Sequence, residues 1–188
     1  MNAGDGKHQH PTQALLDLYT MRSALGRLEG LHVAIVGDVL HSRVARSLIQ
    51  ALDLVGASCV LVGPPTLIPR GIGVESSSAI ETLAEADVVY VLRMQQERML
   101  EGANYVPSLR EYAERWGVTR ERLRPGQVVM HPGPMNRGVE IDPAVADAAN
   151  ALIQQQVRSG LVVRMAVLYD LLTCGPVEVE AEVAEEVA

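Results

Sequence analysis

Three short segments carry side chains whose types and spacing could do chemistry. His10 and Gln13 close the polar stretch GDGKHQHPTQ, directly before an apolar pattern typical of a helix. Arg93 and Gln95 stand two residues apart in RMQQER, so they share one side of the chain if it stays extended. The segment HPGPMNRG (131–138) adds a Pro-Gly-Pro loop. Imidazole, amide and guanidinium groups together suit a small anionic ligand with a polarised carbonyl.

The start of the first predicted helix is the first candidate site. Pro11 suits the first helical position, where its missing N–H is no loss. Apolar residues then recur at helical spacing, which predicts a helix over residues 10–22. His10 and Gln13 would lie in its first turn, beside unpaired N–H groups and the positive end of the helix dipole. This position can hold an anion or a carbonyl oxygen. The plainer alternative is a polar cap with a glycine turn.

Arg43 opens a second predicted helix, over residues 43–55. A cation there opposes the helix dipole, at a cost of roughly 0.3–1 kcal/mol, so its presence is better explained if an anion binds beside it. Arg93 carries less weight, because solvation or pairing with Glu97 would also explain it. Together, the two guanidinium groups favour a ligand with two carboxylates, which the planar fork matches bidentately.

Strands and helices alternate along the body of the chain. Apolar β-branched runs predict strands at residues 31–36, 59–65, 86–93 and 127–134, and helical patterns fall at 43–55, 78–85, 107–116, 143–156 and 161–172. The last two are expected as separate closing helices around Gly160. This alternation predicts an α/β fold, a Rossmann-like three-layer parallel sheet with helices on both faces. Ligands bind at the carboxyl ends of such strands, where the candidate residues stand.

Several other classes of function are disfavoured. The turn GDVLHSR after the first strand has one glycine and not G-x-G-x-x-G, so a dinucleotide is not expected. The scattered histidines and the two cysteines lack metal-ligand spacing, so neither a metal nor a cofactor is expected. Two cysteines without such spacing also suggest a reduced, cytosolic protein. No run of eighteen apolar residues exists, so no membrane span is expected.

The formal charge of −7 arises largely at the carboxyl end, where five glutamates fall in residues 178–188. Without them, 18 acidic residues face 16 basic ones, so the body is nearly neutral. Such a body offers no basic patch for nucleic acid. The end itself reads as a solvated acidic tail.

Three motifs together carry a resemblance. GDGKHQHPTQALLDLYT, RMQQER and HPGPMNRGVEI, in this order and at these spacings, resemble the aspartate carbamoyltransferase family over residues 2–172. The related ornithine enzymes usually read HPCQ and HCLP at these places. They also bind a cationic side chain, which Arg93 would repel.

The resemblance implies a reaction and a role for each residue. The aspartate α-amine attacks the carbonyl of carbamoyl phosphate, giving N-carbamoyl-aspartate and phosphate in pyrimidine biosynthesis, without cofactor or metal. By resemblance, His10 donates to the carbamoyl oxygen, where negative charge develops, and Gln13 contacts the carbamoyl amide. The resemblance also supplies the substrate-binding residues: Arg43 for an aspartate carboxylate, Arg93 with Gln95 for the β-carboxylate, and the Pro132 and Gly133 carbonyls for N–H groups.

The resemblance also implies how the chain is organised. Residues 1–30 would form an interdomain segment and linking helix carrying HPTQ, 31–160 the aspartate-binding α/β domain, 161–174 a closing helix, and 175–188 an acidic disordered tail. Residues 94–107 would be a lid over the substrates. The family's amino-terminal domain, with its Ser-Thr-Arg-Thr phosphate cradle, is missing from this sequence.

Two functions of different class remain. The first is a cytoplasmic transferase, a homotrimer when full length, that is inactive without its amino-terminal domain. The second is a non-catalytic binding or assembly module of the same fold.

Overall fold

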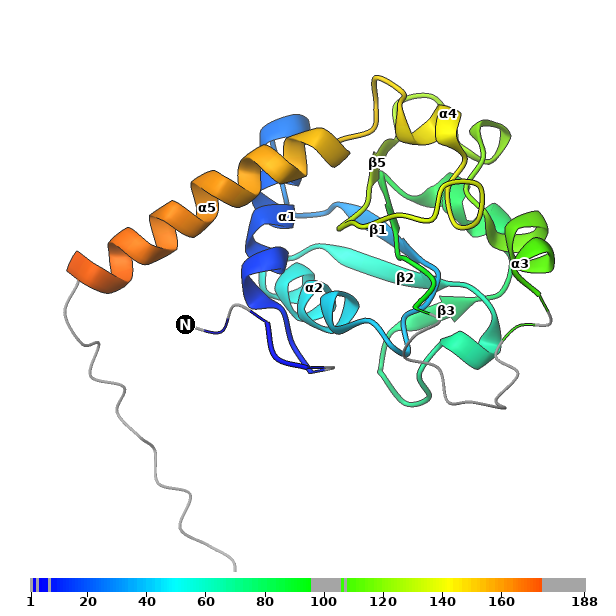
Figure 1. Cartoon of the computed structure of the whole chain (residues 1–188), viewed down its shortest axis with the longest axis horizontal. Coiled ribbons are helices and arrows are strands. Elements are labelled where there is room, and N and C mark those ends of the chain that lie inside the picture. The colour runs from blue at the N-terminus through cyan, green and yellow to red at the C-terminus, as the bar shows by residue number, and fades with distance from the viewer. Residues whose placement is uncertain (1, 3, 7, 96–105, 107, 174–188) are drawn as a thin grey trace, which may run out of the picture.

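A five-stranded sheet forms the centre of the molecule (Figure 1). The computed structural model describes residues 2, 4–6, 8–95, 106 and 108–173. Every pairing is parallel, and the strand order is β3-β2-β1-β4-β5. The strands are β1 (His32–Val36), β2 (Ser58–Val62), β3 (Glu75–Ser77), β4 (Val88–Val91) and β5 (Val128–Met130). The sequence analysis missed β3, because three polar residues on an edge strand leave no apolar run.

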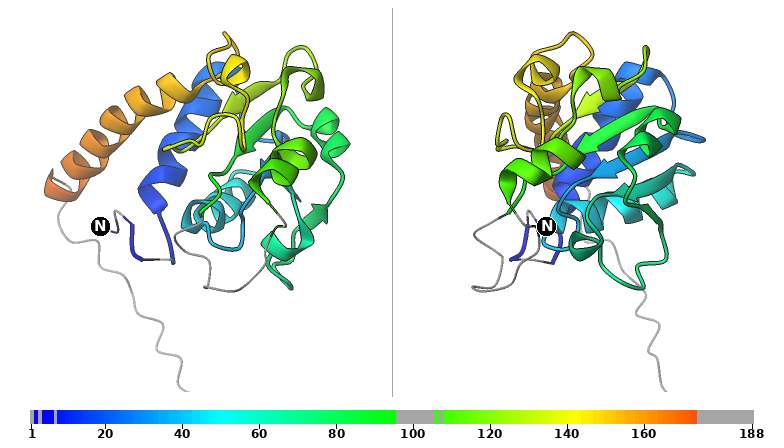
Figure 2. Two further views of the ribbon diagram at one scale, coloured as in Figure 1. Left: turned by 45° about the vertical axis from the view of Figure 1, so that its right-hand side comes forward. Right: turned by 90° about the vertical axis from the view of Figure 1, so that its right-hand side faces the viewer.

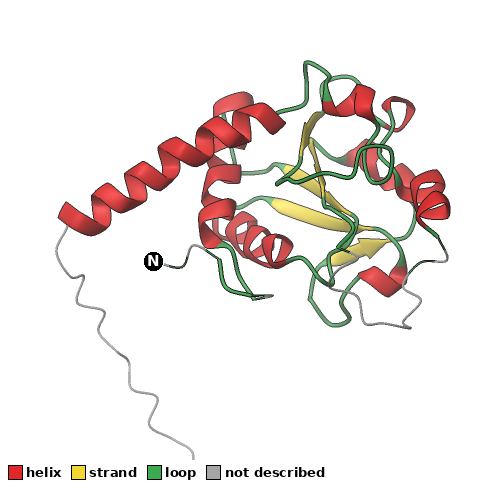
Figure 3. Ribbon diagram, viewed as in Figure 1, coloured by secondary structure: helices red, strands yellow, loops and turns green. Residues whose placement is uncertain are grey.

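Helices cover both faces of the sheet, so the predicted three-layer α/β fold is confirmed (Figure 3). On one face, α1 (Pro11–Leu25) and α2 (Arg43–Leu54) pack on the strands, and α5 (Ile153–Thr173) packs outside α1. On the other face lie α3 (Leu109–Trp116), α4 (Pro143–Ala146) and the 3-10 turn η2 (Ile80–Glu85). Two further 3-10 turns are η1 (Pro65–Leu67) and η4 (Arg120–Arg122). The apolar core is therefore divided in two by the sheet.

Local chemistry explains where the helices begin and end. α1 has Pro11 at its first position and ends at Gly26, whose φ of 76° suits a left-handed cap. The Ser42 hydroxyl caps α2 by accepting the Ala45 N–H at 3.1 Å. The Ser108 hydroxyl caps α3 in the same way through the Glu111 N–H.

The prediction of two separate closing helices, divided at Gly160, is wrong in where it divides them. Of residues 143–156, the first four form α4 and the last four begin α5. The chain at residues 150–152 instead pairs with the outer side of β5: Val129 N–H donates to Asn150, and Leu152 N–H donates to Val129. The second predicted helix is part of one continuous helix, α5, which runs through Gly160 (Figure 2). A Cβ atom on Gly160 would lie 2.8 Å from Nη1 of Arg164 in the same helix and at ordinary contact distance, 3.4 Å, from a methyl group of Leu16 in α1. This buried glycine lies inside the helix and does not break it.

Some expectations fall outside the described residues. The predicted lid lies mostly on residues 96–105 and 107, and the acidic tail on 174–188. Glu97, a candidate partner of Arg93, is also outside. Among the described residues, no helix is long and apolar enough to cross a membrane.

The outer half of α5 exposes a stripe of large apolar side chains. Leu161 is 65% exposed, Met165 61% and Leu168 48%, and their spacing of four and three residues places them on one side of the helix. Leu15 and Tyr19 of α1 are also about half exposed. Exposed apolar side chains of this kind favour association between molecules.

We expect the 188-residue chain to self-associate at micromolar concentration and to bind a hydrophobic dye, because water is released from this stripe on contact. The double substitution Met165→Lys and Leu168→Glu should restore a monomer in light scattering. Gln154→Lys, at an exposed polar position of the same helix, is the control and should associate as the parent does. A dilution-independent monomer of the parent chain that binds no dye would contradict the expectation.

Candidate functional site

Three adjacent strands end at the same edge of the sheet. β1 pairs with β4 up to Val36 and Val91, and β4 pairs with β5 up to Tyr90 and Met130. Arg93 and Gln95 follow β4, and the loop with Pro132 and Gly133 follows β5. Arg43 begins α2, directly after the loop that leaves β1. The sheet therefore brings these predicted residues to one edge.

His10 lies at the start of α1 and is attached to the start of α2. Its backbone N–H donates to the Ser47 hydroxyl at 2.9 Å, and its Nδ1 lies 3.4 Å from the Thr12 hydroxyl. This contact with α2 also brings the imidazole near Arg43. The pKa of His10 is lowered by burial first, and then by the positive charges of Arg43 and Arg164. His10 is therefore a neutral imidazole near pH 7, able to donate a hydrogen bond without carrying a charge.

The glycine-rich segment before His10 wraps around Arg43. The guanidinium donates to the Gly6 carbonyl at 3.3 Å. A Cβ atom on Gly4, whose φ is 125°, would lie 3.3 Å from the guanidinium carbon. A side chain at Gly4 would crowd the arginine, so the glycine has a specific role that a turn alone would not require.

Asp38 joins the ends of β1 and β4. This buried carboxylate follows β1, accepts the Gln95 backbone N–H at 3.2 Å, and lies 2.8 Å from Nδ1 of His41. The Gln95 end of the segment RMQ is thus fixed against the loop that leads to Arg43. Arg93, two residues before Gln95, is partly buried.

A second buried carboxylate, Asp17 in α1, connects that helix with β4 and α5. One of its oxygens, Oδ1, accepts the side-chain amides of Gln13 at 3.0 Å and Gln156 at 2.8 Å. The other, Oδ2, accepts the Tyr90 hydroxyl at 2.6 Å. Gln156 in turn accepts the His131 backbone N–H at 2.9 Å. Hydrogen bonds thus run from Gln13 in HPTQ to the first residue of the HPGP loop.

The environment of Asp17 is fully enclosed, with no solvent exposure. Burial raises its pKa to about 7, and the hydrogen bonds from Tyr90, Gln156 and Gln13 oppose that rise. The pKa of Tyr90 is raised in turn by its own burial and by the Asp17 charge. The tyrosine therefore stays a hydrogen-bond donor.

The His131 ring holds the loop that follows β5. Its Nδ1 accepts the Gly133 N–H at 2.9 Å, so Nε2 is the nitrogen that carries hydrogen, and it lies 3.4 Å from Glu140. Gly133 has a φ of 68°, and the peptide bond to Pro134 is cis. The buried His131 ring thus holds the turn that contains Pro132, which is half-buried, and Gly133, which is exposed.

Sequence reasoning missed Asp17, Asp38, Gln156 and Glu140. One signal was available for Asp17: it stands between Leu16 and Leu18, four residues after Gln13, on the face that the helix buries. A charged residue on a buried face indicates a polar partner. Gln156 carried no comparable signal, because its position was assigned to the wrong helix.

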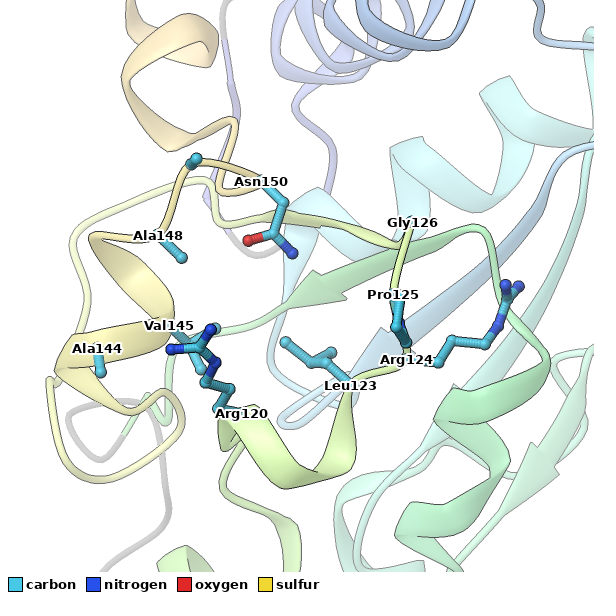
Figure 4. Close-up of a pocket in the computed structure, with 10 residues that line it drawn as sticks. Arg120, Leu123, Arg124, Pro125, Gly126, Ala144, Val145, Ala148 and Asn150 are labelled. Atoms are coloured by element: carbon cyan, nitrogen blue, oxygen red, sulfur yellow. The ribbon is translucent and has the colours of Figure 1, made fainter.

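A pocket of about 580 Å³ lies elsewhere (Figure 4). Its wall includes Arg120, Val145 and Asn150 beside the segment that enters β5. This places it at the amino end of β5, the opposite edge from the predicted site. No predicted site residue lines it.

Residues 29–171 match the family described as Aspartate/ornithine carbamoyltransferase, Asp/Orn binding domain. The chain belongs to this family. Over 182 residues, 93% of the chain, it is 57% identical to an aspartate carbamoyltransferase catalytic subunit of Pelotomaculum thermopropionicum. One from Gluconacetobacter diazotrophicus is 58% identical over 180 residues, covering 92% of the chain and 55% of that protein. The chain spans 58% of the Pelotomaculum protein, so the rest of that length has no counterpart here.

Solved structures agree with the family assignment. The catalytic subunit of M. jannaschii aspartate transcarbamoylase superposes with a TM-score of 0.78 at 34% identity, over 92% of this chain and 59% of that one. The Trypanosoma cruzi enzyme, in complex with carbamoyl phosphate, also gives 0.78, at 31% identity over 89% and 57% of the two chains. The fold and the family predicted from the three motifs are therefore confirmed.

The His10 environment gives a direct test of the site. Arg43→Gln removes one of the positive charges that lower the pKa of His10, so that pKa should rise, while burial keeps it below the ordinary value. An NMR titration of the His10 ring protons measures the change. Arg46→Gln, one turn later in α2, is the control and should leave the pKa in place. An unchanged His10 pKa in Arg43→Gln would show that the two side chains are not neighbours.

Proposed function

We propose that this chain is the aspartate-binding half of an aspartate carbamoyltransferase, which transfers the carbamoyl group of carbamoyl phosphate to L-aspartate. The observation that carries the proposal is the junction at the start of α1, where a neutral His10 lies beside Arg43 at the edge that also presents RMQ and HPG. The names of its relatives and the substrates bound in the Trypanosoma cruzi enzyme support the same reaction. The alternative, a non-catalytic module, would not require this set of polar groups.

His10 and Gln13 are assigned to the carbamoyl group. As the amine attacks, negative charge grows on the carbamoyl oxygen, and the Nε2–H of a neutral imidazole at a helix start donates to it. Keeping His10 uncharged prevents it from binding phosphate as a simple cation. Gln13, in the first turn of α1, contacts the carbamoyl amide.

Arg43, Arg93 and Gln95 are assigned to aspartate. Arg43 binds one carboxylate beside the start of α2, where the helix dipole adds to the attraction. Arg93 binds the β-carboxylate, with Gln95 beside it. The carbonyls of Pro132 and Gly133 accept from the amine or carbamoyl N–H groups, which orients the attacking nitrogen. The departing phosphate takes the amine proton.

The remaining assignments rest on the family alone. Binding of the carbamoyl phosphate phosphoryl group is assigned to the part of the relatives' length that this chain does not span. We further propose a cytoplasmic homotrimer once that part is supplied. The active enzyme is expected to need no metal or cofactor.

Carbamoyl-aspartate formation by the 188-residue chain should be unmeasurable, because no group in it is assigned to the phosphate. Adding a separately expressed amino-terminal half of a relative should restore activity. The control is the same half added to the His10→Ala chain, which should remain much less active. An active isolated chain would show that a phosphate site exists in it. No activity after complementation would favour the non-catalytic module.

In the complemented enzyme, Arg93→Lys should weaken aspartate binding roughly ten- to a hundredfold, because a charge-assisted bond worth about 1.5–3 kcal/mol is lost. A ligand that lacks the β-carboxylate should be affected much less, and the KM for carbamoyl phosphate should stay near normal. Arg43→Lys should weaken both ligands. Arg110→Lys, on the exposed side of α3, is the matched control. Equal losses for the two ligands in Arg93→Lys would refute the β-carboxylate assignment.

A further inference from the structure

The buried carboxylate of Asp17 has no role in the reaction as described so far. It does not reach the sheet edge, since it is enclosed by α1, β4 and α5. Yet its partners include Gln13, and through Gln156 the residue directly before Pro132. Removing such a carboxylate from water is costly unless hydrogen bonds replace the lost solvation. Three donors supply them here: two amides and a phenol.

We infer that Asp17 is a positioning residue that sets which end of the Gln13 amide faces the substrate and fixes the HPGP loop relative to HPTQ. The inference rests on the proposed function, because it concerns the same site. Oδ1 of Asp17 accepts the NH2 group of Gln13 at 3.0 Å, so the buried carboxyl group holds that end of the amide. The carbonyl oxygen of Gln13 then points away from Asp17. A carbamoyl group presents an NH2, and the oxygen is the end of Gln13 that can accept from it.

The second amide follows the same logic. Gln156 donates its NH2 to the same Asp17 oxygen, which leaves its own oxygen to accept the His131 N–H. Both amide orientations are thus fixed by one acceptor. His131 N–H begins the loop whose Pro132 and Gly133 carbonyls are assigned to the substrate N–H groups. One atom, Oδ1 of Asp17, therefore aligns acceptors that lie on two different segments.

Tyr90 offers an internal comparison. Its hydroxyl donates to the other oxygen, Oδ2, and it contacts neither the HPGP loop nor His10 in the hydrogen bonds of the described residues. Tyr90→Phe removes this bond and also a hydrogen bond between Tyr90 and the Gln13 side chain, but it leaves Gln156 untouched. Positioning through Oδ1 predicts that this variant keeps the Gln156 geometry and the His131 backbone N–H signal, whereas a general need for three donors to the carboxyl group predicts that it does not.

The first experiment uses the 188-residue chain and needs no activity. In NMR spectra, Asp17→Leu should shift the side-chain NH2 signals of Gln13 and Gln156 and also the backbone N–H signal of His131. Asp17→Asn keeps an acceptor oxygen and should restore all three. Gln156→Met should shift His131 and leave Gln13 nearly in place. This variant also keeps the test available if Asp17→Leu does not fold. A His131 signal unmoved by Gln156→Met, or Gln13 signals unmoved by Asp17→Leu, would overturn the inference.

The second experiment uses the complemented enzyme. Asp17→Leu should lower kcat/KM for carbamoyl phosphate roughly ten- to a hundredfold, the value of a bond to a charged group, and should leave the KM for aspartate little changed. Asp17→Asn should recover most of the loss. Equal kinetics of Asp17→Leu and the parent would overturn the inference. An inactive parent would instead overturn the proposed function, and the NMR result would still decide whether Asp17 aligns the two segments.

Discussion

Parallel pairing of β1, β4 and β5 is the constraint on which the site depends. Parallel strands in register end together, so the loops that leave them meet at one edge of the sheet. Arg43, Arg93 and Gly133 lie far apart in the sequence and come to one edge of the sheet because of this pairing. The apolar core on both sides of the sheet resists any slip in register.

The sheet brings the loops of the site to one edge, and buried polar groups then fix how these loops lie. Asp38 ties the end of β1 to the end of β4, and Asp17 ties α1 to β4 and α5. The His131 ring fixes the turn that contains Gly133. In each case a group without solvent must find its partners inside the protein, and only one arrangement of the neighbouring loops provides them. Such groups cost stability when a partner is lost, but they specify geometry more sharply than apolar contacts do.

Much of the fold was readable from the sequence, and the reasons are local. Strand β4 and the part of β1 after His32 are apolar, and Pro11 and the Gly-Asp turn after Val36 mark element boundaries. The failures came where tertiary contacts override local pattern. β3 is polar and exists only because β2 offers it an edge, and α4 is short because residues 150–152 pair with β5. Gly160 gave a misleading signal, because a single glycine inside a helical pattern need not end the helix.

The site shows the same division. The residues predicted to contact substrate stand in recognisable motifs, because chemistry dictates their types. The residues that position these contact residues are scattered along the sequence. Gln156, for example, lies 139 positions from Asp17, to which it is hydrogen-bonded. No spacing rule connects such pairs, so they emerge only from the three-dimensional arrangement.

The two edge strands of the sheet, β3 and β5, leave little backbone free for pairing with another chain. Residues 150–152 occupy the free backbone groups of β5, and β3 at the opposite border has only the polar segment Glu75–Ser77. Neither border therefore offers a long apolar template for another strand. Among the described residues, the large apolar side chains that are exposed lie on helices, whose backbone groups are already hydrogen-bonded. Contacts between copies there join side chains and not strands, so such assemblies should dissolve on dilution.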